Sequence, residues 1–373
     1  MEPVARRELA FVQGLRGLAA LAVMLFHARH FLDGPAHLDA GPRLFGSGAA
    51  GVDLFFVISG FVMAHTAWHL EAGAGTAARF AVRRVARIWP VYAAAYLAVW
   101  LATRAAGGDE FATTAADAAR ALAFVPRNPD GVAPYFGAPL LDGGWTLNYE
   151  VWFYALFALA LLVPRRLRGA TIAAQLAICL VVVTLIAAGR VQLDGQASYG
   201  LASYACVVTS PVLWEFAIGI AIAHLYRARF AIRDRAVCDC LVAVTAALMV
   251  WQLADGVRRG HGPVHWGLST AALVAALALR DKVAPVVVPR WLTWLGDVSF
   301  WLYLFHRLPQ LAVRLYLPSH AHGGGAFFAC IVAGLVLAYA GHRWLERGLA
   351  ERVRRALLAA MARPPSAAAV QPA

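Results

Sequence analysis

Two ionisable residues mark the first apolar run of this sequence. The stretch LRGLAALAVMLFH, residues 15–27, carries Arg16 near its start and His27 at its end. Ionisable side chains inside hydrocarbon are rare and usually face a polar interior or a cavity. Eleven residues at about 100° each bring both onto one helix face, about 16 Å apart along the axis. One face thus presents a fixed cation and a titratable base at two depths. The alternative is that Arg16 snorkels to the headgroups and His27 caps the helix end.

A second basic group lies in AVRRVARIWPVY, residues 81–92. Arg84 and Arg87 are three residues apart and therefore adjoin on one helix face. Planar, permanently charged guanidinium groups suit a clamp for phosphate. The alternative is that these arginines only anchor the inner end of a span. Pro90 is expected in the first turns of this span, where its missing N–H costs little.

Carboxylates and a second histidine are expected in other spans. Glu150 in GGWTLNYEVWFY should lie roughly 9 Å below the outer surface, and Tyr303 and His306 lie together in GDVSFWLYLFH. Asp53 in GVDLFFVISGF should lie at the outer start of a span, where it either caps the helix or contacts substrate. Glu215 is expected near the middle of its span, as a partner for a buried Arg or Tyr.

The expected placement separates two kinds of chemistry. Groups suited to phosphate gather at the cytoplasmic side, whereas His27, Glu150 and His306 gather toward the outside. A carboxylate beside a histidine fixes its tautomer and raises its basicity, which suits general-base catalysis. The pattern indicates a bundle that binds a phosphate-bearing donor from inside and presents a base near the outside. No His or Cys set has the spacing of metal ligands, so no metal site is predicted.

A membrane domain must position these residues. The 373 residues are 61% hydrophobic and 14% charged, whereas soluble domains are roughly half apolar and a quarter charged. We predict an all-α polytopic membrane protein of about ten transmembrane helices, because each apolar stretch matches a hydrocarbon core about 30 Å thick. The spans are expected near residues 10–30, 51–70, 86–104, 144–163, 171–188, 204–225, 237–254, 263–280, 294–313 and 325–345.

The basic residues predict the orientation. With the N-terminus inside, 22 Lys and Arg residues fall in inner segments and 8 in outer ones, which places both termini in the cytoplasm. This loop bias also explains the net charge of +12 without a nucleic-acid partner. Residues 1–350 are expected to form one membrane domain, and residues 351–373 a basic and then disordered cytoplasmic tail. The Gly- and Pro-rich loop 105–143 should fold over the outer face.

Five motifs in the same order resemble the acyltransferase-3 family of bacterial membrane O-acyltransferases. They lie within about residues 10–345 and read RGLAALAVMLFH, GVDLFFVISGFVM, RRVARIWPVY, WTLNYEVWFY and SFWLYLFH. GVDLFFVISGFVMAHT followed by WTLNYE is most similar to the branch that decorates exopolysaccharides. In this resemblance the family's arginine–histidine pair corresponds to Arg16 and His27, and its Arg-x-x-Arg pair to Arg84 and Arg87.

The resemblance implies an acyltransferase reaction at the bacterial inner membrane. The donor would be acetyl-CoA or a related acyl-CoA, used as a substrate from the cytoplasm, with no permanently bound cofactor. The acceptor would be a hydroxyl of an exported or cell-envelope polysaccharide, a glycan or a lipid-linked oligosaccharide. Membrane lipid and polysaccharide biosynthesis machinery are further expected partners. The residues expected to act are His27, Glu150 and His306 in catalysis, Arg16, Arg84 and Arg87 on the donor, and Asp53 and Tyr303 on the substrate.

Two other classes of protein compete with this interpretation. Polar residues inside ten spans also suit a transporter or a flippase for glycans or lipid-linked glycans. The two halves of the sequence show no convincing duplication, which weakens that alternative. An ion-conducting or purely structural membrane protein would need a continuous ring of polar residues rather than a two-sided arrangement.

Overall fold

Every regular element in the described part of the chain is a helix. The computed structural model describes residues 9–32, 40–105, 113–317 and 323–362. Six helical segments in these ranges are long and apolar enough to cross a membrane. They are Ala10–Leu32, Ala40–Ala67, Ala74–Ala105, Arg165–Ala188, Arg235–Asp255 and Gly324–Leu345. The predicted all-helical, multi-pass membrane architecture is confirmed, whereas the number of ten spans and the orientation of the termini stay predictions.

Shorter helices occupy the other four predicted spans. They are α6 (Trp145–Ala160), α10 (Leu213–Arg227), α12 (Leu268–Val283) and the series α13 (Arg290–Asp297), α14 (Ser299–Phe305) and α15 (Arg307–Tyr316). The ninth predicted span is therefore interrupted at Val298 and again at His306. The second break places His306 at the junction of two helices.

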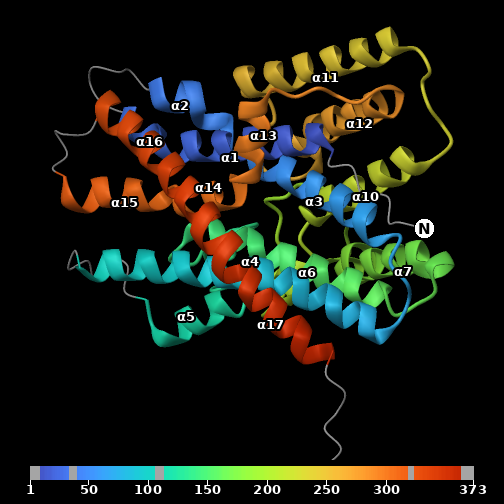
Figure 1. Ribbon diagram of the computed structural model, residues 1–373, viewed down its shortest axis with the longest axis horizontal. Helices are drawn as coiled ribbons and strands as arrows, with labels where there is room; N and C mark the ends of the chain where they lie inside the picture. Colours follow the sequence, from blue (N-terminus) through green and yellow to red (C-terminus); the bar gives the residue numbers. More distant parts are fainter. Residues whose placement is uncertain (1–8, 33–39, 106–112, 318–322, 363–373) are drawn as a thin grey trace, which may run out of the picture.

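Helix α1 (Ala10–Ala28) packs in the middle of the bundle. It contacts α3 (Gly51–Ala67), α13 and α14, and Figure 1 shows these helices around it. Its buried side chains include Phe11, Leu15 and Ala19, which recur every four residues and form one apolar stripe. Arg16 and His27 are half-buried at two levels of the same helix.

Helices α3 and α10 approach each other at backbone distance. A Cβ atom added to Gly60 would lie 2.2 Å from a carbonyl oxygen of α10, and one added to Gly219 would lie 2.1 Å from a carbonyl oxygen of α3. Small residues allow membrane helices to pack this closely. The crossing holds the first turns of α3 and α10 together, with Asp53 on one helix and Glu215 on the other.

Helix α4 (Ala74–Ala105) begins well before residue 86, the expected start of the third span. Pro90 consequently lies in the helix interior, and its expected place in the first turns is wrong. No helix breaker stands between Thr76 and Trp89, so the helix continues beyond the apolar stretch. Helix α17 (Glu351–Ala362) packs against α4 and crosses it in Figure 1. The remaining predicted tail, 363–373, lies outside the described residues, as do Arg6 and Arg7.

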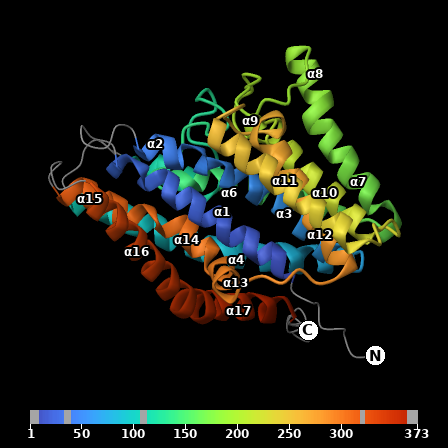
Figure 2. The same cartoon turned by 90° about the horizontal axis from the view of Figure 1, so that it is seen from above.

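The peripheral helices carry the apolar surface. Helices α7 (Arg165–Ala177) and α8 (Val183–Ala188) follow one another along one edge of the molecule in Figure 2. Helix α11 (Arg235–Asp255) packs beside α12, and α16 (Gly324–Gly341) packs against α14. Side chains such as Ile186, Val250 and Phe328 are at least 65% exposed on these helices. Such a surface is suited to contact with lipid.

The charge bias makes a prediction about topology. Val132, 76% exposed, lies in the loop before α6, and Phe230, 58% exposed, lies in the loop before α11. The bias places the first loop outside and the second inside. Val132→Cys should therefore react with an impermeant thiol reagent in cells stripped of the outer membrane, while Phe230→Cys should react only after the cells are lysed. The reverse labelling pattern would overturn the orientation.

The close helix crossing makes a prediction about stability. Gly219→Ala places a methyl group where a backbone carbonyl already lies, and such overpacking typically costs about 1–3 kcal/mol. The thermal midpoint of the purified protein in detergent should fall. Gly325→Ala is the matched control, because that helical glycine has no atom within 4 Å of its added Cβ. Equal midpoints for the two variants would show that the crossing can relax without cost.

Candidate active site

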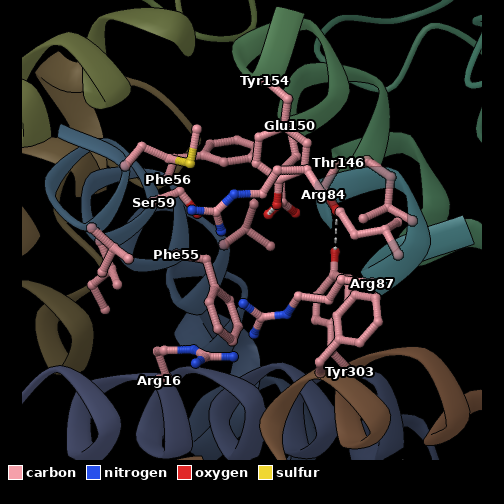
Figure 3. Close-up of a pocket in the computed structure, with 17 residues that line it drawn as sticks. Arg16, Phe55, Phe56, Ser59, Arg84, Arg87, Thr146, Glu150, Tyr154 and Tyr303 are labelled. Carbon is pink, nitrogen blue, oxygen red and sulfur yellow. Dashed lines mark hydrogen bonds between the residues drawn. The ribbon is translucent and has the colours of Figure 1, made fainter. Parts of the chain in front are cut away.

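Three arginines line one pocket between α1, α3, α4 and α6. This arginine pocket is lined by Arg16, Arg84 and Arg87, together with Glu150 and Tyr154. In Figure 3 the three arginine side chains extend into the space beside α3 from α1 and α4. The structure thus brings together the three residues predicted to bind the donor.

The charges in the arginine pocket are unbalanced. Glu150 accepts a short hydrogen bond from the Tyr154 hydroxyl. The Arg84 guanidinium lies 5.5 Å from the centre of the Tyr154 ring and donates to the Thr66 hydroxyl at 3.4 Å. Among the lining residues, one carboxylate faces three guanidinium groups. The surplus of positive charge favours an anionic ligand, since a low-dielectric cleft focuses the field of its charges.

A second cavity, of about 250 Å³, contains the two predicted histidines. This histidine pocket is lined by His27, His306 and Asp142, and also by aromatic residues that include Tyr135 and Trp145. The ring centres of His27 and His306 are 5.1 Å apart. The two histidines are far apart in the sequence, and the packing of α1 against α14 brings them together.

Hydrogen bonds fix the orientation of His306. Its Nδ1 lies 3.0 Å from the carbonyl oxygen of Leu302 and must donate, because a carbonyl only accepts. Its buried Nε2 has no hydrogen-bond partner among the residues that the structure describes. A neutral ring with Nδ1–H therefore presents a lone pair on Nε2. That lone pair is available to a hydroxyl group or to a neighbouring ring N–H.

Asp142 supplies negative charge beside the histidines. It precedes α6, accepts from the Gly143 backbone N–H at 2.8 Å and forms an ion pair with Arg307 at 3.0 Å. Burial by itself would raise the pKa of Asp142, but Arg307, His27 and His306 together hold this pKa below its ordinary value. The carboxylate therefore stays charged and can stabilise a proton gained by a nearby imidazole.

The two pockets adjoin and share one wall. Val52 and Tyr303 line both of them. The Tyr303 hydroxyl lies 3.0 Å from the Thr146 hydroxyl and donates to the Gly143 carbonyl at 3.2 Å; the first of these contacts is the dashed line in Figure 3. The reacting ends of two ligands, one in each pocket, would meet at this wall.

Two expected placements differ from the structure. Glu150 lines the arginine pocket and not the histidine pocket, so the expected grouping of Glu150 with His27 and His306 is not found. Glu150 instead lies beside Tyr154, one turn further along α6, and both side chains line the arginine pocket. Asp53 is fully buried and lines neither pocket. Asp142 stands beside the histidines instead.

Sequence reasoning missed Asp142 and His261, both of which line the histidine pocket. Asp142 stands directly before the motif that contains Glu150, and an acid next to a helix start was a usable signal. No sequence signal marks His261, because only contacts between distant segments bring its loop to the pocket. Among the described residues, no group of three or more His, Cys, Asp or Glu side chains could hold a metal ion.

Comparisons with known proteins agree on one family. Residues 9–343 match the family model Acyl_transf_3, described as an acyltransferase domain. The chain is 31% identical to "Exopolysaccharide production protein ExoZ" of Rhizobium meliloti (strain 1021), over 89% of this chain and 96% of that protein. It is 28% identical to "Putative membrane-bound transacylase BcsY" of Komagataeibacter xylinus, over 94% of this chain and 85% of that protein. No solved structure gives a significant match. The chain, with its paired arginine and histidine pockets, therefore belongs to the Acyl_transf_3 family of membrane acyltransferases.

Proposed function

We propose that this protein transfers an acetyl or other short acyl group from cytoplasmic acyl-CoA to a hydroxyl of an exported polysaccharide, in the bacterial inner membrane. The observation that carries the proposal is the pair of pockets that share Val52 and Tyr303. One pocket is cationic, and the other is lined by three imidazoles and the carboxylate of Asp142. The relative from Rhizobium meliloti is named for exopolysaccharide production, which supports a polysaccharide as the acceptor class.

The arginine pocket suits the donor. Acyl-CoA carries phosphate groups at one end and a thioester at the end of a long flexible arm. Guanidinium groups bind phosphate through short, charge-assisted hydrogen bonds. The charge bias of the loops places the start of α4, with Arg84 and Arg87, on the cytoplasmic side. Arg16 lies on α1 and would contact the donor from another side of the pocket.

The histidine pocket suits the chemical step. The acceptor hydroxyl attacks the thioester carbonyl, His27 accepts the hydroxyl proton, and the CoA thiolate leaves after the tetrahedral intermediate collapses. His306, 5.1 Å from His27 between ring centres, would help to hold the proton or the hydroxyl. Asp142 would stabilise the positive charge that His27 gains. No covalent acyl-enzyme is needed for this transfer.

A transporter or flippase of glycans is the second candidate function. The apolar helices and the polar residues within them would suit either activity. Two adjoining pockets, one cationic and one with histidines beside a carboxylate, favour the transferase, which must bring a donor and a base together. Release of CoA from acetyl-CoA by the purified protein, in the presence of polysaccharide, would distinguish the two candidates.

The first prediction of this proposal concerns the donor. Arg84→Ala and Arg87→Ala should each weaken binding of acetyl-CoA to the purified protein by about 10–100-fold, because each removes hydrogen bonds to a charged group. Lysine should restore binding only in part, since it lacks the planar fork. Arg104→Ala, at the other end of α4, is the control and should bind normally. Normal binding of acetyl-CoA by both pocket variants would show that these arginines only anchor the end of the helix at the membrane surface.

The second prediction concerns the base. His27→Gln should lower acyl transfer by about 10²–10⁴-fold, while binding of acetyl-CoA stays unchanged, because glutamine keeps polarity but cannot accept the proton. His224→Gln on α10 is the control, since His224 lines neither pocket. The measurement is transfer of labelled acetyl to polysaccharide at saturating donor. Acetyl transfer by His27→Gln at the wild-type rate would show that His27 is not the base, and His306 would be the next residue to test.

A further inference from the structure

A buried histidine–acid cluster borders the histidine pocket on the side of α3. His261 Nδ1 lies 2.8 Å from Asp53 Oδ2, and the Gly262 backbone N–H donates to Asp53 Oδ1 at 2.9 Å. The same N–H lies 3.1 Å from Glu215 Oε1. His261 is 3% exposed, and both carboxyl groups are fully buried. Burial of such groups is costly, and their hydrogen bonds offset only part of that cost.

The hydrogen bonds of this cluster determine what His261 offers to a ligand. A carboxylate oxygen only accepts, so Nδ1 carries a proton, and in the neutral ring Nε2 presents a lone pair. His261 also lines the histidine pocket. Because Nδ1 is bound to Asp53, Nε2 is the ring atom available to a molecule in that pocket. Asp53 itself lines neither pocket and acts only through His261.

Aromatic rings stand next to this acceptor atom. The ring centre of His261 lies 5.6 Å from that of Trp145 and 5.9 Å from that of Tyr135, and both residues line the same pocket. Tyr135 is 37% exposed and reaches the cavity from the loop before α6. A hydrogen-bond acceptor beside aromatic faces matches a pyranose ring, which has hydroxyl groups at its edge and C–H groups on its faces. The cavity of about 250 Å³ is below the roughly 300–1,000 Å³ of sites for larger ligands, so one sugar ring suits it better than a length of chain.

We propose that His261, Tyr135 and Trp145 form the subsite that binds the acceptor sugar ring. His261 Nε2 accepts a hydrogen bond from a hydroxyl that is not acylated, and the aromatic rings pack against the sugar's C–H faces. Asp53 is a positioning residue that fixes the tautomer of His261. A ring held there would present a second hydroxyl to His27, which lines the same cavity. This inference rests on the proposed function and identifies where its acceptor binds.

The test separates acceptor binding from donor binding and chemistry. Purified wild type and variants are assayed with acetyl-CoA and with unacetylated polysaccharide isolated from cells that lack the gene. His261→Gln and Tyr135→Ala should each raise KM for the polysaccharide about tenfold, the effect of one lost hydrogen bond or ring contact. KM for acetyl-CoA should not change. Asp53→Asn should behave like His261→Gln, because Gly262 N–H and His261 Nδ1–H bind different oxygens of Asp53 and the amide NH2 would turn a donor toward one of them.

The same segment provides a matched control. His265 also pairs with an acid, Asp194 at 3.2 Å, but it does not line the histidine pocket. His265→Gln should keep both KM values at the wild-type level. An unchanged polysaccharide KM in His261→Gln and Tyr135→Ala, with wild type active, would overturn the subsite and leave the proposed function intact. A wild type that transfers no acetyl from acetyl-CoA would instead overturn the proposed function and this inference with it. If His261→Gln misfolds and loses acetyl-CoA binding, the polysaccharide KM of Tyr135→Ala decides whether the subsite exists.

Discussion

The absence of hydrogen-bond partners in hydrocarbon is the constraint on which this structure depends. Every buried charge must find its partners inside the protein or face a cavity. Arg168 finds its partners in the backbone, since its two terminal nitrogens donate to the carbonyl oxygens of Ala67, Trp68 and Leu70 at the end of α3. Arg168 therefore stabilises a helix end. Arg87, by contrast, lines the arginine pocket. Arginine thus stabilises the fold at one position and lines a pocket at another. The hydrogen-bond partners around each side chain distinguish the two roles.

Helix α1 connects the two pockets because it contributes to both. Arg16 lines the arginine pocket and His27 the histidine pocket, on one continuous helix. A rigid helix holds the two side chains at a constant separation, which a pair of loops would not do. Helices α3 and α14 complete the arrangement by placing Val52 and Tyr303 at the shared wall. In the proposed function, this arrangement would bring donor and acceptor groups together at Val52 and Tyr303.

Local sequence patterns predicted the helices and the arginine pocket well, because helical spacing and charge are local properties. Arg84 and Arg87 adjoin for the simple reason that they are three residues apart on α4. The histidine pocket depends instead on contacts between distant segments. His261 and Asp53 are 208 positions apart in the sequence, and no periodic pattern predicts a contact between them. Glu150 was grouped with the histidines from its depth along the helix alone, and depth does not tell which of two adjoining pockets a side chain lines.

The thin wall at Tyr303 has an electrical consequence for a protein with pockets open to opposite sides of a membrane, as proposed here. Aqueous space conducts ions, so a transmembrane voltage falls mainly across whatever insulating layer remains. With water in both pockets, that layer would be reduced to the residues that line both of them, Val52 and Tyr303, instead of the full hydrocarbon thickness. A proton on His27 and a negative charge in the arginine pocket would then lie on opposite sides of the voltage drop. The energetics of the proposed acyl transfer would thus include a contribution from the membrane potential.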